Sequence, residues 1–252
     1  MAKKGLILMN LGSPDSTKVS DVRSYLREFL MDERVLDLPY IGRFFLVNGI
    51  IAPFRAPKSA EAYRAIWTKE GSPLITFTKE LRSAVQDYIP ENVEIAMRYG
   101  QPNPKLAYDN LLKNNPDLEE VILFPLYPHY AMSSYETAVE YMKKVYKEQG
   151  YSFKLKNVPA YFDHPDYVHA LVESIRPHLE QDYDKILFSY HGVPERHIHK
   201  GHDEFHPELP KNTICEGECP VTDFCYRAQV RKTTKLVIDA LHIPDGKWEQ
   251  TF

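Results

Sequence analysis

The stretch Leu187-Phe188-Ser189-Tyr190-His191-Gly192-Val193-Pro194 ends an apolar run typical of a strand and places a histidine in the turn that follows. In an open α/β sheet, ligands bind beyond the carboxyl ends of the strands. An imidazole at such a position is held by a rigid element and is available for proton transfer or metal binding. The local pattern leaves one alternative open, a structural histidine that only forms hydrogen bonds.

Strand-like and helix-like runs alternate along almost the whole chain. We expect strands at 5–11, 93–99, 120–127, 153–158 and 185–190, and a last strand that starts at 248. Helical periodicity covers 20–30, 59–68, 76–88, 104–114, 134–148, 167–180 and 226–241. The alternation predicts an α/β fold of two doubly wound, Rossmann-like units with parallel sheets around a central cleft, the second unit incomplete. We expect the first domain to span residues 1–160 and the second 161–252.

Composition narrows the function classes. The chain has 252 residues, of which 43% are hydrophobic, so it can bury a substantial core. Its 31 Lys and Arg stand against 35 Asp and Glu, so no basic surface for nucleic acid is expected. The sequence contains neither a phosphate loop nor a dinucleotide fingerprint, and no nucleotide cofactor is predicted. No apolar run is long enough for a membrane span or a signal peptide, and we expect a cytoplasmic protein.

Residues 38–54 are rich in bulky apolar side chains, with Arg43 as the one charged group. A buried helix is the first interpretation of this segment. The second is an apolar lip, including Leu46, Ile50 and Ile51, that touches the membrane from one side to collect a greasy substrate.

Several stretches together resemble the ferrochelatases, which insert ferrous iron into a porphyrin. They are residues 188–197, which contain His191; 225–229, which open a helix; 8–14, at the end of the first strand; and 96–100 and 125–130, at the ends of two further strands. These stretches follow the family's order and are spread from residue 8 to residue 229, which makes chance agreement improbable. On these motifs the chain is identified as a member of the ferrochelatase (protohaem ferro-lyase) family.

The resemblance implies a lyase that converts ferrous iron and a dicarboxylate porphyrin, protoporphyrin IX, to haem in the last step of haem biosynthesis. His191 would accept pyrrole protons and contact the iron. Two alternatives stay open: a fragment that binds porphyrin or haem without turnover, and a related chelatase that uses cobalt or a more acidic tetrapyrrole. Peripheral membrane contact is compatible with this reading, and nothing in the sequence indicates an oligomeric state.

A porphyrin site needs apolar and aromatic walls with cations and hydroxyls for the propionates. Arg98 could form a bidentate pair with a carboxylate, and a structural ion pair is its alternative. Ser134 could equally cap the helix that starts there. The candidate substrate-binding residues are Asn10, Ser13, Arg55, Tyr63, Arg98, Tyr99, Tyr127, Tyr130, Ser133 and Ser134.

Cysteines and histidines cluster after His191. Cys215, Cys219 and Cys225 favour a metal or [2Fe–2S] site over a disulfide in a cytoplasmic protein, and zinc or free thiols are the alternatives. Four histidines and two acidic residues also follow, but their spacing does not require a second metal site, and we expect a solvated loop there. These residues are His197, His199, His202, Asp203, Glu204 and His206.

The resemblance also concerns the end of the chain. In ferrochelatases, a segment like 248–252 continues into a loop that carries a catalytic glutamate facing the histidine. The sequence stops at Phe252, so we expect this C-terminal part to be missing.

Overall fold

The structure is a computed structural model that describes residues 3–205 and 221–252. Its contacts divide the chain into two compact units. The first consists of Met1–Leu126 and Glu136–Val158, and the second of Tyr127–Tyr135 and Pro159–Phe252. The short segment Tyr127–Tyr135 therefore groups with the second unit. The domain limits expected from the sequence, 1–160 and 161–252, stay a prediction.

A parallel sheet of four strands forms the centre of the first unit. Its strands are β1 (Lys4–Gly12), β2 (Asn92–Tyr99), β3 (Glu120–Pro125) and β4 (Lys154–Asn157), in the order β2-β1-β3-β4. Leu8 of β1 lies between Ile95 of β2 and Phe124 of β3. Each of these strands confirms a predicted one. Because the winding direction reverses after β2, the carboxyl ends of β1 and β3 form the switch point where ligands bind in such sheets.

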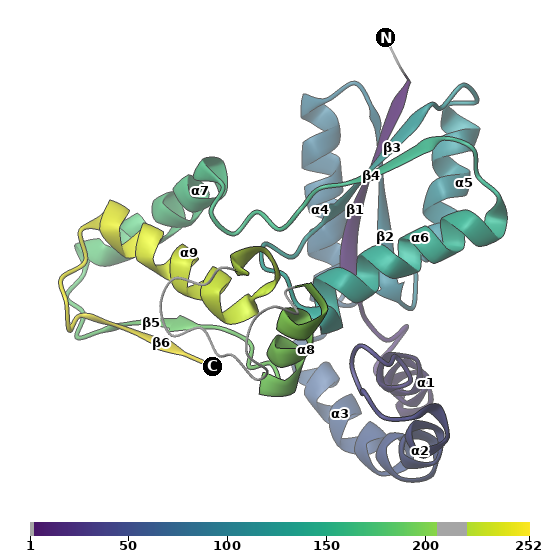
Figure 1. Cartoon of the computed structure of the whole chain (residues 1–252), viewed down its shortest axis with the longest axis horizontal. Helices are drawn as coiled ribbons and strands as arrows, with labels where there is room; N and C mark the ends of the chain where they lie inside the picture. Colours follow the sequence, from purple (N-terminus) through teal and green to yellow (C-terminus); the bar gives the residue numbers. More distant parts are fainter. Residues whose placement is uncertain (1–2, 206–220) are drawn as a thin grey trace. The chain divides into compact units, whose positions relative to one another are not determined.

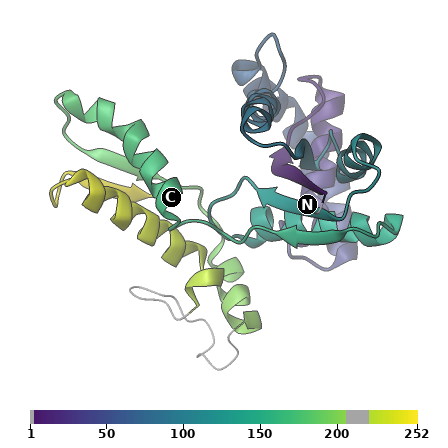
Figure 2. The ribbon, with the colours of Figure 1, turned by 90° about the horizontal axis from the view of Figure 1, so that it is seen from above.

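Helices cover both faces of this sheet (Figures 1 and 2). On one face, α4 (Pro73–Tyr88) packs Leu74, Ile75 and Val85 against a cluster that includes Leu8 and Val93. On the other face lie α5 (Pro104–Asn114) and α6 (Thr137–Gln149), where the Tyr108 hydroxyl donates to the Met142 carbonyl. The three helices confirm the predicted ones, and the parallel sheet flanked by helices confirms the fold class.

Five helical elements connect β1 to β2, of which α4 is the last. The four that precede it are α1 (Val19–Leu30), α2 (Tyr40–Phe45), the π-helical turn η1 (Leu46–Ile51) and α3 (Ala52–Ile66). Val22 and Leu26 of α1 pack against Ala56 and Ala60 of α3.

The expectation of a buried helix in residues 38–54 is wrong. The segment is helical, but Tyr40, Ile41, Phe45 and Phe54 are 64–77% exposed. The buried residues of this segment are Arg43, Val47 and Ala52, and most of its bulky apolar side chains are exposed. No helix within the described residues is long and apolar enough to cross a membrane.

The second unit has a small parallel sheet of two strands, β5 (Ile186–Ser189) and β6 (Trp248–Thr251). Its long helices are α7 (Pro165–Ile175) and α9 (Tyr226–Leu241), which contact each other. Two 3-10 turns, η3 (Arg176–Glu180) and η4 (Thr222–Phe224), follow α7 and precede α9. The predicted strands at 185–190 and 248 and the helices at 167–180 and 226–241 are confirmed.

The solvated loop expected after His191 is wrong for its first part. Residues Glu195–Phe205 form a helix, α8. His197 and His202 of this helix are buried, with exposed fractions of 6% and 1%. Pro194 and the many polar residues hid this helix from hydrophobic periodicity, although Ile198 packs against a buried cluster. His206 lies outside the described residues.

Candidate active site

The carboxyl end of β1 carries two predicted binding residues and a required glycine. Asn10 donates from Nδ2 to Thr78 Oγ1 at 3.0 Å, and Ser13 is buried. Gly12 has a φ of +104°, and a Cβ atom there would lie 1.8 Å from the Tyr99 carbonyl oxygen. Only glycine fits this close approach of two strand ends. The turn therefore keeps Asn10 and Ser13 at the switch point.

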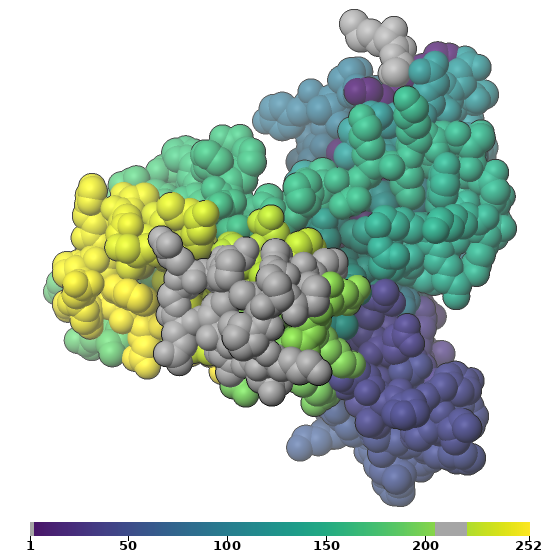
Figure 3. All heavy atoms as spheres, viewed as in Figure 1, coloured from purple at the N-terminus to yellow at the C-terminus, as the bar shows by residue number. Residues whose placement is uncertain are grey.

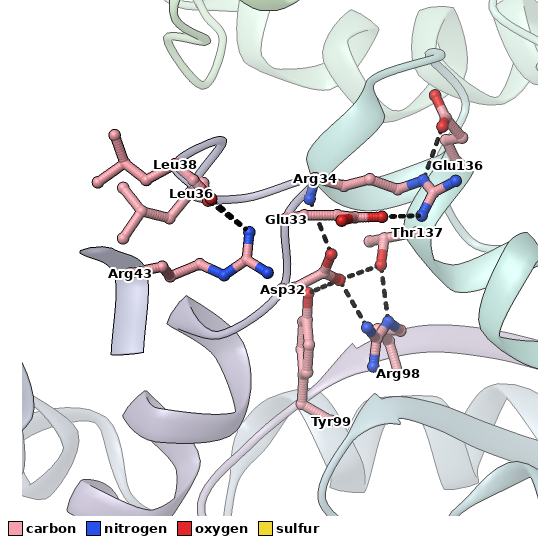
Figure 4. A network of polar contacts seen from close by, with 10 residues as sticks. All are labelled: Asp32, Glu33, Arg34, Leu36, Leu38, Arg43, Arg98, Tyr99, Glu136 and Thr137. Carbon is pink, nitrogen blue, oxygen red and sulfur yellow. Dashed lines mark hydrogen bonds and ion pairs between the residues drawn. The ribbon is translucent and has the colours of Figure 1, made fainter. Parts of the chain in front are cut away.

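Arg98 and Tyr99 end β2, and the structure places both in a polar network (Figure 4). Arg98 Nη2 lies 2.6 Å from Asp32 Oδ2, and Nε donates to Thr137 Oγ1 at 2.7 Å. The Tyr99 hydroxyl donates to the same Asp32 oxygen at 2.8 Å, and its ring is fully buried. The ion pair that the sequence left as an alternative for Arg98 is thus present. A propionate that binds this guanidinium would therefore share it with the Asp32 carboxylate.

The two candidates on α3 differ in surroundings. Arg55 is exposed. Tyr63 is half-buried and packs edge-on against Tyr25 and Trp67, with ring centroids 6.3 and 6.2 Å apart. Burial raises the pKa of the Tyr63 hydroxyl, so it stays a neutral hydrogen-bonding group at physiological pH.

His191 lies two residues after the last residue of β5 and is exposed. The preceding amide, of Tyr190, donates to the Thr251 carbonyl at 2.9 Å, which continues the β5–β6 ladder to the edge of the turn. The next residue, Gly192, lines a cavity of about 300 Å³ together with Val193, Glu195, Ile198, Tyr226, Arg227 and Phe252. His191 therefore directly follows the end of the ladder and directly precedes a residue that lines a cavity, and all residues that line this cavity belong to the second unit.

The segment after β3 carries four candidates, and α9 holds it. The Tyr130 amide donates to Gln229 Oε1 at 2.6 Å, and the Tyr130 ring packs edge-on against Phe224 at 5.5 Å. Ser133 and Ser134 lie in the π-helical turn η2 (Met132–Glu136) and are half-buried, as is Tyr127. The expectation that Ser134 caps a helix does not hold, because α6 begins three residues later with Glu136 at its N-cap.

Sequence reasoning missed the polar residues that hold these candidates. His129 Nε2 is hydrogen bonded to Thr233 Oγ1 at 2.9 Å, and its ring packs edge-on against Tyr190 and Tyr226. Burial lowers the pKa of His129 to about 4. Asp32 was missed likewise. The sequence signal for the hydrogen bonds from α9 is the pair Gln229 and Thr233, which lie one helical turn apart on an otherwise apolar face.

Of the three cysteines, the structure describes only Cys225; Cys215 and Cys219 lie outside the described residues. Cys225 is fully buried in a cluster with Val221 and Ala228, against which Ile198 packs. Burial raises the pKa of its thiol. Among the described residues, no group of three or more His, Cys, Asp or Glu side chains could hold a metal ion.

Comparisons with known proteins show the family of this chain. The family model described as Ferrochelatase matches residues 3–252. A ferrochelatase of Pseudomonas syringae pv. tomato is 42% identical over 254 residues, which cover 100% of this chain and 74% of the relative. A ferrochelatase of Porphyromonas gingivalis is 39% identical over 257 residues, which cover 100% of this chain and 72% of the relative. The chain belongs to the ferrochelatase family.

Proposed function

We propose that this protein is a ferrochelatase, a lyase of haem biosynthesis that inserts ferrous iron into protoporphyrin IX. The reaction replaces two pyrrole N–H protons with one Fe²⁺ and releases two protons. The observation that carries this proposal is the family match over residues 3–252, at about 40% identity to ferrochelatases along the whole chain. Neither the cobalt chelatase nor the binding fragment receives support from these relatives.

His191 is our proposed proton acceptor and iron contact. Its imidazole is exposed at the end of β5, beside a cavity whose wall begins at Gly192. A neutral imidazole has one nitrogen lone pair. It can take a pyrrole proton and pass it to water, and at a separate step the same nitrogen can bind iron as the metal sheds water. Because the Tyr190 amide is bonded to the Thr251 carbonyl, the backbone next to His191 would need little rearrangement when substrate arrives.

At the first unit's switch point, we propose that Asn10, Ser13 and Arg98 bind porphyrin, and we propose the same role for Ser133 and Ser134, which group with the second unit. These groups lie at or just beyond the carboxyl ends of β1, β2 and β3, where polar side chains can meet propionates. Tyr63 and Arg55 would contribute a ring and a cation from α3. Tyr99 is a weaker candidate than the others because its ring is fully buried and its hydroxyl is occupied by Asp32.

The exposed apolar surface of α2, η1 and α3 supports a peripheral membrane contact. Phe45 and Phe54 are 69% and 77% exposed, and no acidic residue occurs between Asp37 and Glu61. This surface is open in Figure 3, where the segment is purple to blue. A Phe45→Ser variant should bind anionic phospholipid vesicles more weakly than the unmodified chain, because less apolar surface would enter the interface. Phe77→Ser is the control, since Phe77 is similarly exposed on α4; equal loss in both variants would contradict the proposal.

A [2Fe–2S] cluster at Cys215, Cys219 and Cys225 is supported only by the sequence spacing. The surroundings of Cys225 are apolar and disfavour a thiolate, the form that binds iron. The described residues thus do not fit a cluster site, and we assign the cluster no part in the reaction. Visible absorbance and iron content of anaerobically purified protein would test it.

The test of the main proposal is an anaerobic assay of ferrous iron or zinc insertion into protoporphyrin IX. His191→Ala should lower the rate about 100-fold or more, because general acid–base groups contribute on that scale. His178→Ala, an exposed histidine on η3, is the matched control and should keep full activity. Porphyrin binding without metallation by the unmodified chain would instead support a binding fragment. Equal activity of His191→Ala and the control would refute the assigned role.

A further inference from the structure

A buried carboxylate in the first unit has no role in the proposed reaction. Asp32 follows α1, and its side chain is 4% exposed. Figure 4 shows it at the centre of a network formed by the loop after α1, the end of β2 and the start of α6. A buried charge is costly unless it is paired and hydrogen bonded, so its retention here calls for a physical reason.

Both oxygens of this carboxylate accept hydrogen bonds. Oδ2 accepts from Arg98 Nη2 at 2.6 Å, from the Tyr99 hydroxyl at 2.8 Å and from the Thr137 hydroxyl. Oδ1 accepts from the Arg34 amide at 2.8 Å. Burial alone would raise the pKa of Asp32, but these hydrogen bonds and the Arg98 charge outweigh it and hold the pKa below its usual value.

The network fixes the Arg98 guanidinium in one orientation. Thr137 Oγ1 accepts from Nε, Asp32 accepts from Nη2, and the rings of Tyr99 and Tyr141 each lie 4.3 Å from the guanidinium carbon. The remaining nitrogen, Nη1, has no hydrogen bond to another described residue. Hydrogen bonds hold Nε and Nη2, and two aromatic rings pack against the guanidinium, so Nη1 is the nitrogen that can bind a ligand.

The same loop is tied to the elements on either side of it. Arg34 Nε donates to Glu136 Oε1 at 2.7 Å, in the turn that carries Ser133 and Ser134. Arg43 of α2 is buried, and its Nη1 donates to the carbonyls of Leu36 and Leu38 at 3.2 and 3.0 Å. The loop therefore connects the apolar surface of α2 to the polar strand ends.

We propose that Asp32 is a positioning residue for porphyrin binding, which acts by holding Arg98 so that Nη1 meets a propionate. The inference rests on the proposed function. Asp32 does not touch the substrate; it removes the orientational freedom that Arg98 would otherwise lose on binding. It also neutralises most of the Arg98 charge. The site would therefore recognise a carboxylate through a directional hydrogen bond from Nη1, and less through long-range electrostatic attraction.

The test compares two porphyrins by fluorescence titration of the full chain: protoporphyrin IX and its dimethyl ester, which lacks the carboxylates. Asp32→Asn keeps the size of the side chain and should weaken protoporphyrin IX binding about tenfold, the scale of one charge-assisted hydrogen bond, while the ester binds as before. In an Arg98→Gln background, the same substitution should have no further effect. Asp109→Asn, in an exposed carboxylate on α5, is the matched control.

Equal weakening for both porphyrins would overturn the proposal, because it would show a general structural role. Unchanged or tighter binding of protoporphyrin IX would overturn it as well. If the unmodified chain binds neither porphyrin, the proposed function itself fails, and this inference with it. Hydrogen exchange gives a readout that does not depend on porphyrin. Asp32→Asn should speed amide exchange in residues 33–38 and leave exchange in β1 unchanged. Equal exchange in the variant and the unmodified chain would contradict the positioning role of Asp32.

Discussion

The buried His129 makes the stability of the second unit depend on pH in a way that can be calculated. Its pKa is about 4 in the folded chain, because burial disfavours the imidazolium, against 6.5 for an unperturbed histidine. The unfolded chain therefore binds this proton first as pH falls. Stability should be lost between about pH 6.5 and pH 4, with no further loss from His129 below that window. From pH 7.5 to pH 5, these two values predict a loss of about 2 kcal/mol.

The assay is urea unfolding at pH 7.5 and pH 5, followed by tryptophan fluorescence. The chain has two tryptophans, Trp67 in the first unit and Trp248 in the second, so a Trp67→Phe background reports the second unit. His129→Gln cannot ionise and can still hydrogen bond to Thr233. Its loss of stability between the two pH values should be about 2 kcal/mol smaller than that of the parent.

His178→Gln is the control for histidine titration in general, because His178 is exposed on η3. It should show the same pH dependence as the parent. If His129→Gln also does so, within about 0.5 kcal/mol, the imidazole is not held neutral by burial and the reasoning is refuted. The comparison uses the difference between pH values, so any constant cost of the substitution cancels.

Two further substitutions test how the site is held. Gly12→Ala should destabilise the first unit by about 3 kcal/mol or more, because φ is +104° and the new Cβ would overlap the Tyr99 carbonyl; near-normal urea stability would show that the two strand ends are farther apart. Gln229→Leu should cost about 2–4 kcal/mol by removing the partner of the buried Tyr130 amide, whereas Gln149→Leu, at the exposed end of α6, should change stability by less than about 0.5 kcal/mol. Equal effects of the two Gln substitutions would contradict the anchoring role of α9.

The strands and most helices could be predicted because their signals are local. β1 and β2 alternate with amphipathic helices, and α5 and α9 begin and end at the predicted residues. Helix α8 was expected to be a loop, because two of its buried residues are His197 and His202, which hydrophobic periodicity does not count. The exposure of Phe45 agreed only with the second of two interpretations, because the sequence of an apolar helix is the same whether its bulky side faces a core or the outside.

The candidate site was predictable to the extent that it lies at strand ends. His191 and Arg98 follow strands, so their place at a sheet edge follows from topology. Their partners do not, because Asp32 precedes Arg98 by 66 residues and Gln229 follows Tyr130 by 99. Such pairs form only when the chain folds, and each partner in isolation looks like an ordinary polar residue.

The buried polar face of α9 gives a physical reason for the sequence that follows Cys225. An apolar side chain at Gln229, Thr233 or Thr234 would fill the same space without the cost of burying a polar group. Instead, Gln229 holds the amide of Tyr130, Thr233 holds His129, and Thr234 Oγ1 lies 2.9 Å from the hydroxyl of Tyr190, the residue before His191. One helix thus fixes the segment after β3 and the segment after β5, which are far apart in sequence. A reacting group displaced by about 1 Å can lose most of its effect on the rate. The rigid connection between these two segments therefore gives a functional reason to bury three polar side chains, although their burial lowers stability.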